Sequence, residues 1–182
     1  MTPIDIANSA LSLLGEPPIS RFDANGTLPQ RMAYLHYHPV RREVLRILKP
    51  EFAQRTETIG TFAEPDGKTS LPHTLPDGCL RVLKVTPSEA WTLRSRQIFS
   101  PHKLLEVRYI YDQEDTELFE EHFTNIFALR LATKMCIPLV NSTTLRNELM
   151  ESYTKFTTPN QTETPTEDNN TLYNLWRKSL SK

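Results

Sequence analysis

Glycine, cysteine and net charge are all scarce in this chain. Its five glycines form no glycine-rich phosphate loop and no G-x-S-x-G elbow, so the common nucleotide-binding and hydrolase motifs are absent. The two cysteines, Cys79 and Cys136, do not form a C-x-x-C pair, which predicts reduced, buried thiols in an intracellular protein. A formal charge of −1 is untypical of dedicated nucleic-acid-binding proteins, which usually carry a basic excess.

Signals for export and membrane insertion are also lacking. No basic stretch precedes an apolar run at the N-terminus, so no secretory signal is expected. No uninterrupted apolar run approaches the roughly 20 residues that a membrane-spanning helix requires. We therefore expect a soluble protein that is made in a cytoplasm and has no membrane partner.

Proline is abundant instead, with 14 residues, and hydrophobic residues make up only 38% of the chain. This combination predicts stiff connections and a surface that partner chains complete. A chain of 182 residues is long enough for one domain with an appendage.

The N-terminal part has helical patterns. Thr2 is suited to cap a first helix with Pro3 at its first position, and Gly15 is suited to end it. A second helix is predicted from Leu28 to Leu48, kinked or split at Pro39. The apolar side of this helix is expected to contain Met32, Leu35, Val44, Leu45 and Leu48.

The middle third has a different pattern. Frequent prolines between Pro50 and Pro101 rule out long helices. Strands are predicted at 80–85, 91–98 and 104–111. We expect a small antiparallel sheet or barrel-like insertion over residues 50–111, between two helical parts.

A long helix with an aromatic face is predicted after this insertion, and its start at 114–117 is acidic. Large apolar residues repeat every four positions and so share one helical face. They are Phe119, Phe123, Phe127, Leu131 and Met135. Pro138 is expected to interrupt the helix, and a last helix is predicted to begin at Asn141 or Ser142. Because the apolar face holds no catalytic or ligand-binding group, it is expected to serve packing.

The predicted fold class is therefore α+β, a bundle of about four main helices with a small antiparallel β-rich insertion and an extended C-terminal tail. The body is expected to span residues 1–156, with helical parts at 1–49 and 112–156. Residues 157–182 are expected to form a linker and a docking segment. From Thr157 to Thr171 no large apolar residue occurs, which is typical of linkers.

Three segments, taken in order, carry a resemblance to a known family. The first runs from Ile6 to Ile19 and includes Gly15-Glu16-Pro17-Pro18. The second runs from Tyr37 to Ala53 and includes His38-Pro39-Val40-Arg41. The third begins with Leu75-Pro76-Asp77-Gly78 and resumes from Val107 to Ala132. Together they resemble the tail tubular protein A family, the head-to-tail adaptors of short-tailed phages and related particles.

The resemblance covers residues 4–156, with two departures. Glu51 stands where the family pattern often has an aromatic residue. The loop from Gly60 to Ser70 is short and has no clear counterpart. These differences bear on the shape of the β-rich insertion rather than on the order of the three segments.

The resemblance implies a structural, non-enzymatic protein of the virion head–tail junction, made in the cytoplasm of a bacterial host. It implies a ring of twelve copies below the portal, with the tail nozzle or the next neck protein beneath it. Such an adaptor binds the portal after DNA packaging, helps to retain the genome and offers a platform for the tail. DNA is then only passing cargo, and no cofactor is expected.

Two alternatives remain open at this point. One is a small DNA-binding or packaging-regulatory module that uses the basic middle third. The other is an enzyme built on His36 and His38 or on Glu120-Glu121-His122. On a helix, residues two apart point in nearly opposite directions, so the two histidines cannot share a metal ion there. Carboxylates at 120 and 121 also suit the positive end of a helix dipole without any catalytic role.

Charge is distributed unevenly along the chain. Most of the charged residues in 79–108 are basic, whereas residues 112–121 include acids and no base. An ordinary solvated surface would account for both. In a ring, we expect Arg94 and Arg96 of one copy to face Glu114, Asp115 and Glu117 of the next.

Arg42, Arg46 and Lys49 lie along one face of the second predicted helix. They are interpreted as the solvated side of an amphipathic helix. The alternative is contact with acidic residues of the portal or with DNA phosphates.

The C-terminal segment regains apolar character at Leu172, Tyr173, Leu175, Trp176 and Leu180. A helix this short is marginal alone in water, and Trp and Tyr are frequent interface anchors. We expect these residues to dock in a groove of the portal or of a neighbouring copy. The alternative is a final helix that folds back on its own domain.

Overall fold

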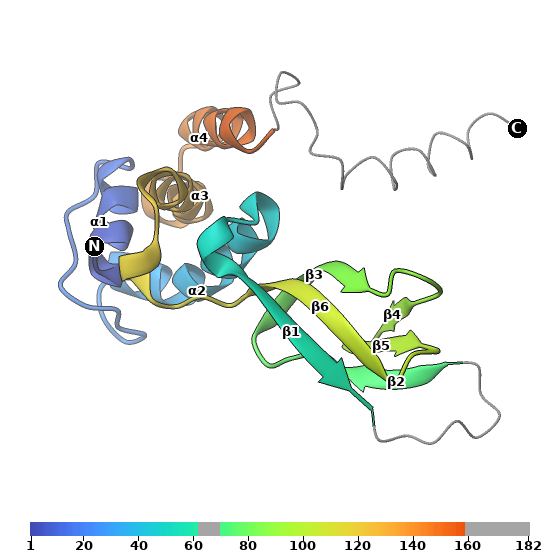
Figure 1. The fold of residues 1–182 in the computed structure, drawn as a ribbon. Helices are drawn as coiled ribbons and strands as arrows, with labels where there is room; N and C mark the ends of the chain where they lie inside the picture. Colours follow the sequence, from blue (N-terminus) through green and yellow to red (C-terminus); the bar gives the residue numbers. More distant parts are fainter. Residues whose placement is uncertain (62–69, 159–182) are drawn as a thin grey trace, which may run out of the picture.

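A computed structural model describes residues 1–61 and 70–158 of the chain. These residues form four α-helices and two small antiparallel sheets, which confirms the predicted α+β class (Figure 1). The helices are α1 (Pro3–Ser12), α2 (Leu28–Leu48), α3 (Glu121–Val140) and α4 (Thr143–Thr157). Two single turns of 3-10 helix, η1 (Glu51–Ala53) and η2 (Thr116–Leu118), connect the helical part to the strands.

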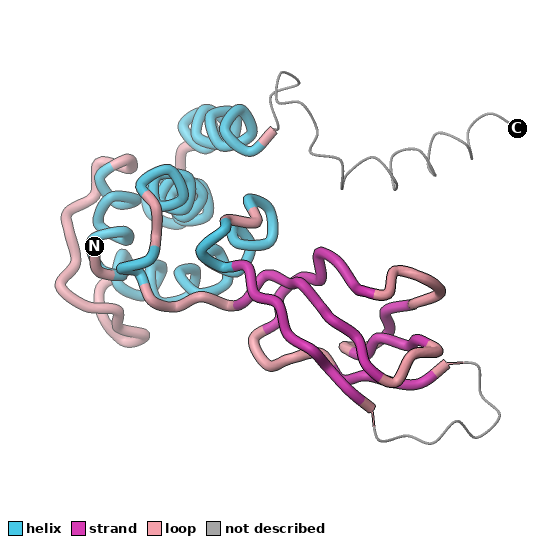
Figure 2. The backbone as a smooth tube through the Cα atoms, in the orientation of Figure 1, coloured by secondary structure: helices cyan, strands magenta, loops and turns pink. Residues whose placement is uncertain are grey.

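The described strands all lie between Gln54 and Tyr111 in the sequence. They are β1 (Gln54–Gly60), β2 (Leu71–Thr74), β3 (Cys79–Thr86), β4 (Thr92–Arg94), β5 (Gln97–Ser100) and β6 (Leu104–Tyr111). One sheet has the order β1-β6-β3 and the other has the order β2-β5-β4, with every pairing antiparallel. Figure 2 shows that helices and strands occupy separate halves of a bent molecule.

Local sequence signals account for the start of the first helix. The Thr2 hydroxyl accepts a hydrogen bond from the Asp5 amide at 3.2 Å, and the Asp5 carboxylate accepts one from the Thr2 amide at 2.7 Å. This reciprocal pair satisfies amides that the helix leaves without partners, and Pro3 needs none. Gly15 follows with a φ of 72°, a left-handed conformation that glycine adopts without strain. The predicted cap and stop are confirmed.

The predicted split of the second helix at Pro39 is wrong, because α2 is continuous from Leu28 to Leu48. Pro39 lies on the exposed side of α2. Its missing N–H leaves the Leu35 carbonyl without a helical partner, and water can reach that face. Leu35 is itself 56% exposed, so its predicted place on the apolar side is also wrong. Val44 and Leu45 are buried as predicted, together with Ala33, Tyr37 and Val40.

Pro138 likewise does not end the third helix. α3 continues through it to Val140, and Asn141 closes the helix in a left-handed conformation with a φ of 52°. The carbonyl that loses its partner belongs to Lys134, which is exposed. Both prolines are therefore tolerated on the solvent side of helices that apolar packing holds together.

The aromatic face of α3 is the centre of the helical part, although α3 begins later than predicted. The acidic residues 114–117 precede it in an extended segment and in η2, and α3 starts only at Glu121. The Phe123 ring centroid lies 4.9 Å from that of Phe119 and 6.1 Å from that of Phe127. The Phe127 ring in turn lies 5.0 Å from the ring of Tyr37 on α2. The predicted packing role of this face is confirmed.

α3, which has 20 residues, also meets the length and composition of a membrane-crossing helix, because one stretch of 18 residues within it has a mean hydropathy of 1.3. It is the central helix of the bundle, with 56% of that stretch buried inside the protein. A core helix has this composition for the same reason that a membrane helix does, since both avoid water along much of their length. The match is therefore weak evidence for a membrane span.

The strand predictions are partly confirmed. Leu80–Val85 lies within β3, and Leu104–Tyr111 is β6. The predicted strand at 91–98 is wrong, because a turn at Ser95 and Arg96 divides it into β4 and part of β5. β1 and β2 were not predicted. β1 is an edge strand with polar residues exposed on both faces, so it lacks the alternation by which strands are recognised.

Each half of the molecule has its own apolar core. The larger core joins all four helices and includes Leu11, Val44 and Phe127. The smaller one lies in the β part and includes Ile98 and Val107. Cys136 belongs to the first and Cys79 to the second, and both are free and buried, as predicted.

Candidate functional site

A buried arginine connects the two halves of the molecule. Arg41 on α2 has a side chain only 1% exposed. Its Nη2 lies 2.8 Å from Asp112 Oδ1 and 2.6 Å from Glu114 Oε1. The neighbouring Arg42 donates from Nε to Asp112 Oδ2 at 2.7 Å. Because removing one partner of a buried ion pair is costly, this cluster holds the segment after β6 firmly against α2.

Two further hydrogen bonds reinforce the junction. Arg46 Nε donates to the Leu80 carbonyl at 3.3 Å, and Arg81 Nη1 donates to the Arg46 carbonyl at 3.1 Å. Both join α2 to strand β3. The sheet β1-β6-β3 is therefore attached to the helical part through α2. The first residues of the acidic segment 112–121 are held in place by the same helix.

Sequence reasoning missed Arg41, although a signal was present. Arg41 follows Val40 and lies four residues after Tyr37 and three before Val44, which places it on the buried side of α2. An arginine at such a position is buried only when acids pair with it. The sequence could not indicate that the acids would come from 112 and 114.

Arg42 and Arg46 are on the exposed face of α2, as expected. Both nonetheless have partners within the chain, so they are not purely solvated. Lys49 ends α2 in a left-handed conformation. Burial, with a smaller contribution from the nearby Arg81 charge, lowers the pKa of its amine. The alternative roles in binding portal acids or DNA phosphates stay untested.

Arg94 and Arg96 lie at the tip of the hairpin formed by β4 and β5. Arg94 pairs with Gln97 in the register, so Ser95 and Arg96 form a two-residue turn. Both turn residues have positive φ, 44° and 66°, which non-glycine residues adopt only at a cost. Arg94 and Arg96 are exposed, and Arg96 Nη2 lies 3.4 Å from the Pro76 carbonyl. We call Arg94 and Arg96 the basic tip.

The acids after β6 divide into two sets. Asp112 and Glu114 are bound by Arg41 and so already have partners within the chain. The others are exposed around η2 and the start of α3. Asp115 Oδ1 accepts a hydrogen bond from the Glu117 amide at 3.0 Å, while Glu120 and Glu121 occupy the first positions of α3. We call Asp115, Glu117, Glu120 and Glu121 the acidic patch.

The basic tip and the acidic patch lie in different parts of the molecule, the tip in the β part and the patch at the start of the second helical segment. Thr116, inside η2, donates a hydrogen bond from Oγ1 to the Met1 carbonyl at 2.7 Å. Figure 1 shows this turn beside the N-terminus, while β4 and β5 lie in the β part. The turn of the β4–β5 hairpin lies next to the loop before β3, because the Leu75 amide donates to the Arg96 carbonyl at 3.1 Å. Within the described part of the chain, no ion pair joins Arg94 or Arg96 to the acidic patch.

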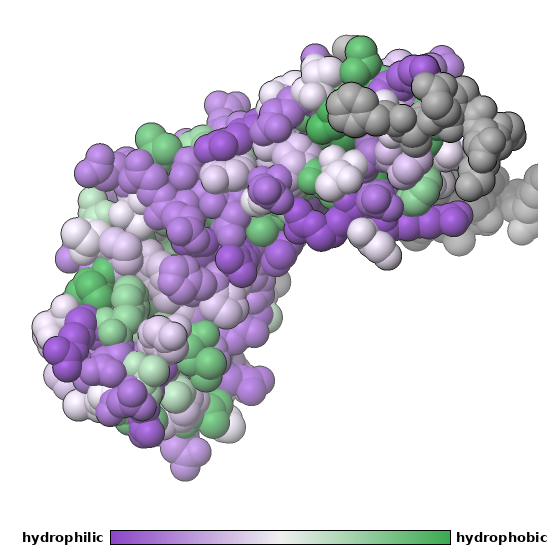
Figure 3. Space-filling view, turned by 90° about the horizontal axis from the view of Figure 1, so that it is seen from below, coloured by the Kyte–Doolittle hydropathy of each residue, from purple (hydrophilic) through white to green (hydrophobic). Residues whose placement is uncertain are grey.

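One face of the molecule offers little apolar surface that would compete with charge for a partner. In Figure 3, hydrophilic side chains predominate on the face shown, and hydrophobic ones form small separate groups. Scattered apolar residues of this kind are normal on a folded protein. Contacts on this face would depend mainly on polar and charged groups.

The residues considered for catalysis do not converge. His36 is half-buried and His38 is exposed, on different sides of α2. Burial lowers the pKa of His36, and the Lys134 charge lowers it further. Glu120 and His122 line an open hollow of about 390 Å³ together with Lys49 and Glu51. Within residues 1–61 and 70–158, no group of three or more His, Cys, Asp or Glu side chains could hold a metal ion.

The predicted docking residues Leu172, Tyr173, Leu175, Trp176 and Leu180 lie outside the residues that the structure describes. No protein-family model matches the sequence, and a search of curated proteins finds no match either.

Proposed function

We propose that this protein is a structural head-to-tail adaptor of a phage or phage-like particle. In this role, twelve copies form a ring under the portal, help to retain packaged DNA and provide the attachment platform for the tail. The observation that carries the proposal is the placement of the basic tip on the β part and of the acidic patch on the helical part of one subunit (Figure 1).

Opposite charges on two different parts of one subunit suit a ring. When two different patches of one subunit bind each other in the next copy, the contact repeats head to tail and closes if the rotation permits. Complementary charges also fix the orientation of neighbours and oppose wrong pairings. The junction around Arg41 supports this role, because it fixes the angle between the β part and the helical part.

The expected strength of this contact suits assembly on a template. An exposed ion pair contributes about 0.2–1 kcal/mol, so a few such pairs hold two free copies together only weakly. A portal ring that binds every copy would raise the local concentration and favour the closed ring. Free monomers that form a ring only on the portal are therefore the expected behaviour.

Charge reversal at the basic tip tests the ring. The double variant Arg94→Glu/Arg96→Glu should lose the twelvefold layer that the native protein adds to portal rings in electron micrographs. Adding Asp115→Lys/Glu117→Lys to the same chain should restore it, because every contact is then reversed. Arg31→Glu, an exposed charge change on α2, is the matched control. An intact layer with the first variant would overturn the proposed interface.

The proposal assigns a second role to the tail. Deleting residues 170–182 should leave a folded body and abolish attachment to the portal, because the aromatic anchors Tyr173 and Trp176 are removed. Circular dichroism reports the fold, and co-sedimentation with portal rings reports attachment. Unchanged attachment would show that the body alone binds the portal.

A further inference from the structure

A groove with a cationic rim lies between α3 and α4. It has a volume of about 310 Å³ and is open to solvent. Its lining residues are Arg130, Thr133, Lys134, Ile137, Arg146 and Met150. The groove is separate from the basic tip, the acidic patch and the Arg41 junction.

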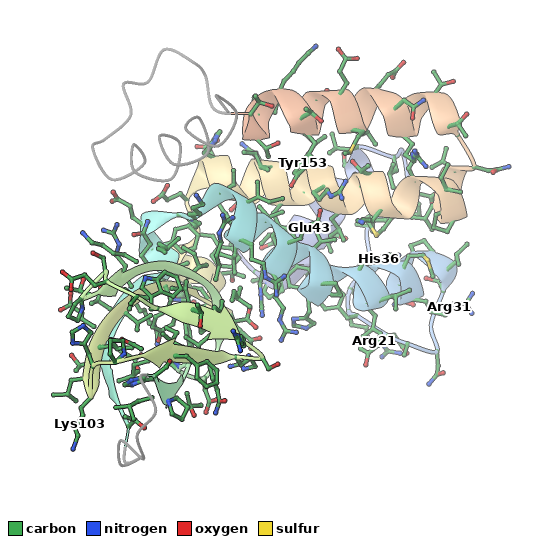
Figure 4. All side chains as sticks on the ribbon, turned by 90° about the vertical axis from the view of Figure 1, so that its right-hand side faces the viewer. Arg21, Arg31, His36, Glu43, Lys103 and Tyr153 are labelled. Carbon is green, nitrogen blue, oxygen red and sulfur yellow. The ribbon has the colours of Figure 1, made fainter. Side chains whose placement is uncertain are left out.

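The cations around the groove outnumber the acids that pair with them. Glu43, from α2, lies 2.6 Å from Arg130 Nη2 and 3.8 Å from Lys134 Nζ. Figure 4 shows Glu43 between α2 and α3, and Tyr153 on the side of α4 that faces α3. Within the described part of the chain, Glu43 is the only acid in an ion pair with the groove, and Arg146 forms no ion pair. The groove therefore has unbalanced positive charge.

The floor of the groove is apolar. Met150 is 39% exposed and Ile137 is half-buried. Thr133 donates its hydroxyl to the Leu129 carbonyl at 2.8 Å, so it does not offer that donor to a ligand. Covering Met150 and Ile137 removes apolar surface from water, which is favourable. The groove thus suits a peptide that carries acids beside large apolar side chains.

Residues 159–176, beyond Thr158, have that composition. Glu163, Glu167 and Asp168 are followed by Leu172, Tyr173, Leu175 and Trp176, and the bases Arg177, Lys178 and Lys182 come only after them. We propose that, in the free protein, the C-terminal segment of the same chain docks in the α3/α4 groove. The acids would lie against Arg146 and Lys134, and an aromatic side chain would cover Met150 and Ile137.

The connection is long enough for this contact. Arg146 lies eleven residues before the end of α4 at Thr157, which is about 17 Å along a helix. The ten residues from Thr158 to Glu167 can span at most about 35 Å when fully extended. An acid near 167 can therefore return to Arg146. A contact within one chain also benefits from an effective concentration in the millimolar range, so weak ion pairs suffice.

Trp176 provides a direct readout of docking. The chain has two tryptophans, so Trp91→Phe leaves Trp176 as the only one. In the free full-length protein, acrylamide should quench Trp176 less than it quenches the same residue in a synthetic peptide of residues 159–182. Adding Arg146→Glu should weaken docking about fivefold, the factor that corresponds to an ion pair near 1 kcal/mol. Quenching should then approach that of the peptide.

Two further variants define the contact. Arg31→Glu makes the same charge change on an exposed part of α2 and should leave the quenching unchanged. Combining Arg146→Glu with Glu163→Lys/Glu167→Lys/Asp168→Lys should restore the protection of Trp176, because the charges are exchanged. Circular dichroism checks that each variant is folded.

Several outcomes would overturn the proposal. Trp176 could be quenched as fully in the native background as in the peptide, or Arg146→Glu could have no effect. If the protection of Trp176 from acrylamide rises with protein concentration, the groove would instead bind the C-terminal segment of a second copy. All measurements use the free protein, so they stand whether or not the chain forms a ring on a portal.

Discussion

The helical part and the β part of this protein differ in how much apolar surface they bury. The helical core involves all four helices and is built around the aromatic face of α3. The β core is much smaller and lies between two three-stranded sheets. Stability rises with buried apolar area, so the helical part should be the stable half. The β part depends on its attachment to α2, and its β4–β5 hairpin carries the basic tip.

The largest expected effect is in the helical core. Phe127 is fully buried and contacts the rings of Tyr37 and Phe123. Phe127→Ala should lower the free energy of unfolding by about 3–5 kcal/mol, measured by urea denaturation. Leu35→Ala on the exposed side of α2 should change it by less than about 0.5 kcal/mol. A small effect of Phe127→Ala would show that the helical part is not the stable half.

The next largest effect concerns the junction between the two halves. Asp112→Ala leaves the buried Arg41 with Glu114 as its remaining partner and should cost roughly 3 kcal/mol. Arg42→Gln removes a pair whose arginine is 49% exposed and should cost less than about 1 kcal/mol. Hydrogen exchange should show that Asp112→Ala exposes amides of β3 and β6 before those of α3. Equal loss of protection in both halves would show that they unfold as one unit.

A pH effect should appear in the β part. His73 is buried and donates from Nε2 to the His102 carbonyl at 2.9 Å. Burial lowers its pKa, and this hydrogen bond partly opposes the shift. The unfolded chain, where histidine titrates near about 6.5, therefore binds the proton more readily. The contribution of His73 to stability is complete above that pH and is lost as pH falls towards the folded pKa.

Urea denaturation from about pH 7.5 down to about pH 5.5 measures this loss. His73→Gln should reduce the change in the stability of the β part with pH. His36→Gln should reduce the corresponding change in the stability of the helical part, because burial also lowers the pKa of His36. Monitoring amides of β5 and α2 separately assigns each change to its half. A pH dependence that His73→Gln leaves unaltered would show that other groups cause it.

The smallest expected effect is on DNA binding. Arg42 and Arg46, on the exposed face of α2, already have partners at Asp112 and Leu80. Heparin should therefore retain the protein only weakly, with an affinity that depends little on salt. A decline in log K against log salt with a slope of several units would indicate several phosphate contacts. Such a result would favour the DNA-binding alternative over the adaptor.

Much of the helical part was predictable from local patterns. Thr2, Pro3 and Gly15 set the limits of α1, and the four-residue spacing from Phe119 to Met135 identified the core face of α3. These signals depend on residues within one or two turns of each other. The effects of Pro39 and Pro138 were overestimated, because proline breaks a helix only when packing and water cannot compensate for the lost hydrogen bond.

The β part was predicted less well. β6 and most of β3 have the expected alternation, but β1 is polar on both faces and β2 contains Pro72. The turn at Ser95 and Arg96 contains neither glycine nor asparagine, which usually mark such a turn. Strand pairing is a long-range property, so a strand that contributes little apolar surface gives a weak local signal.

Composition and periodicity alone determined the α+β class, the four helices, the apolar face of α3 and the separation of basic and acidic residues along the chain. Only the tertiary structure decided that Arg41 is buried between Asp112 and Glu114, and that Arg94 and Asp115 lie in different parts of the molecule. The physical reason is distance along the chain. Helix signals come from residues within a turn, whereas ion pairs and surface patches depend on segments that are brought together or kept apart only when the whole chain folds.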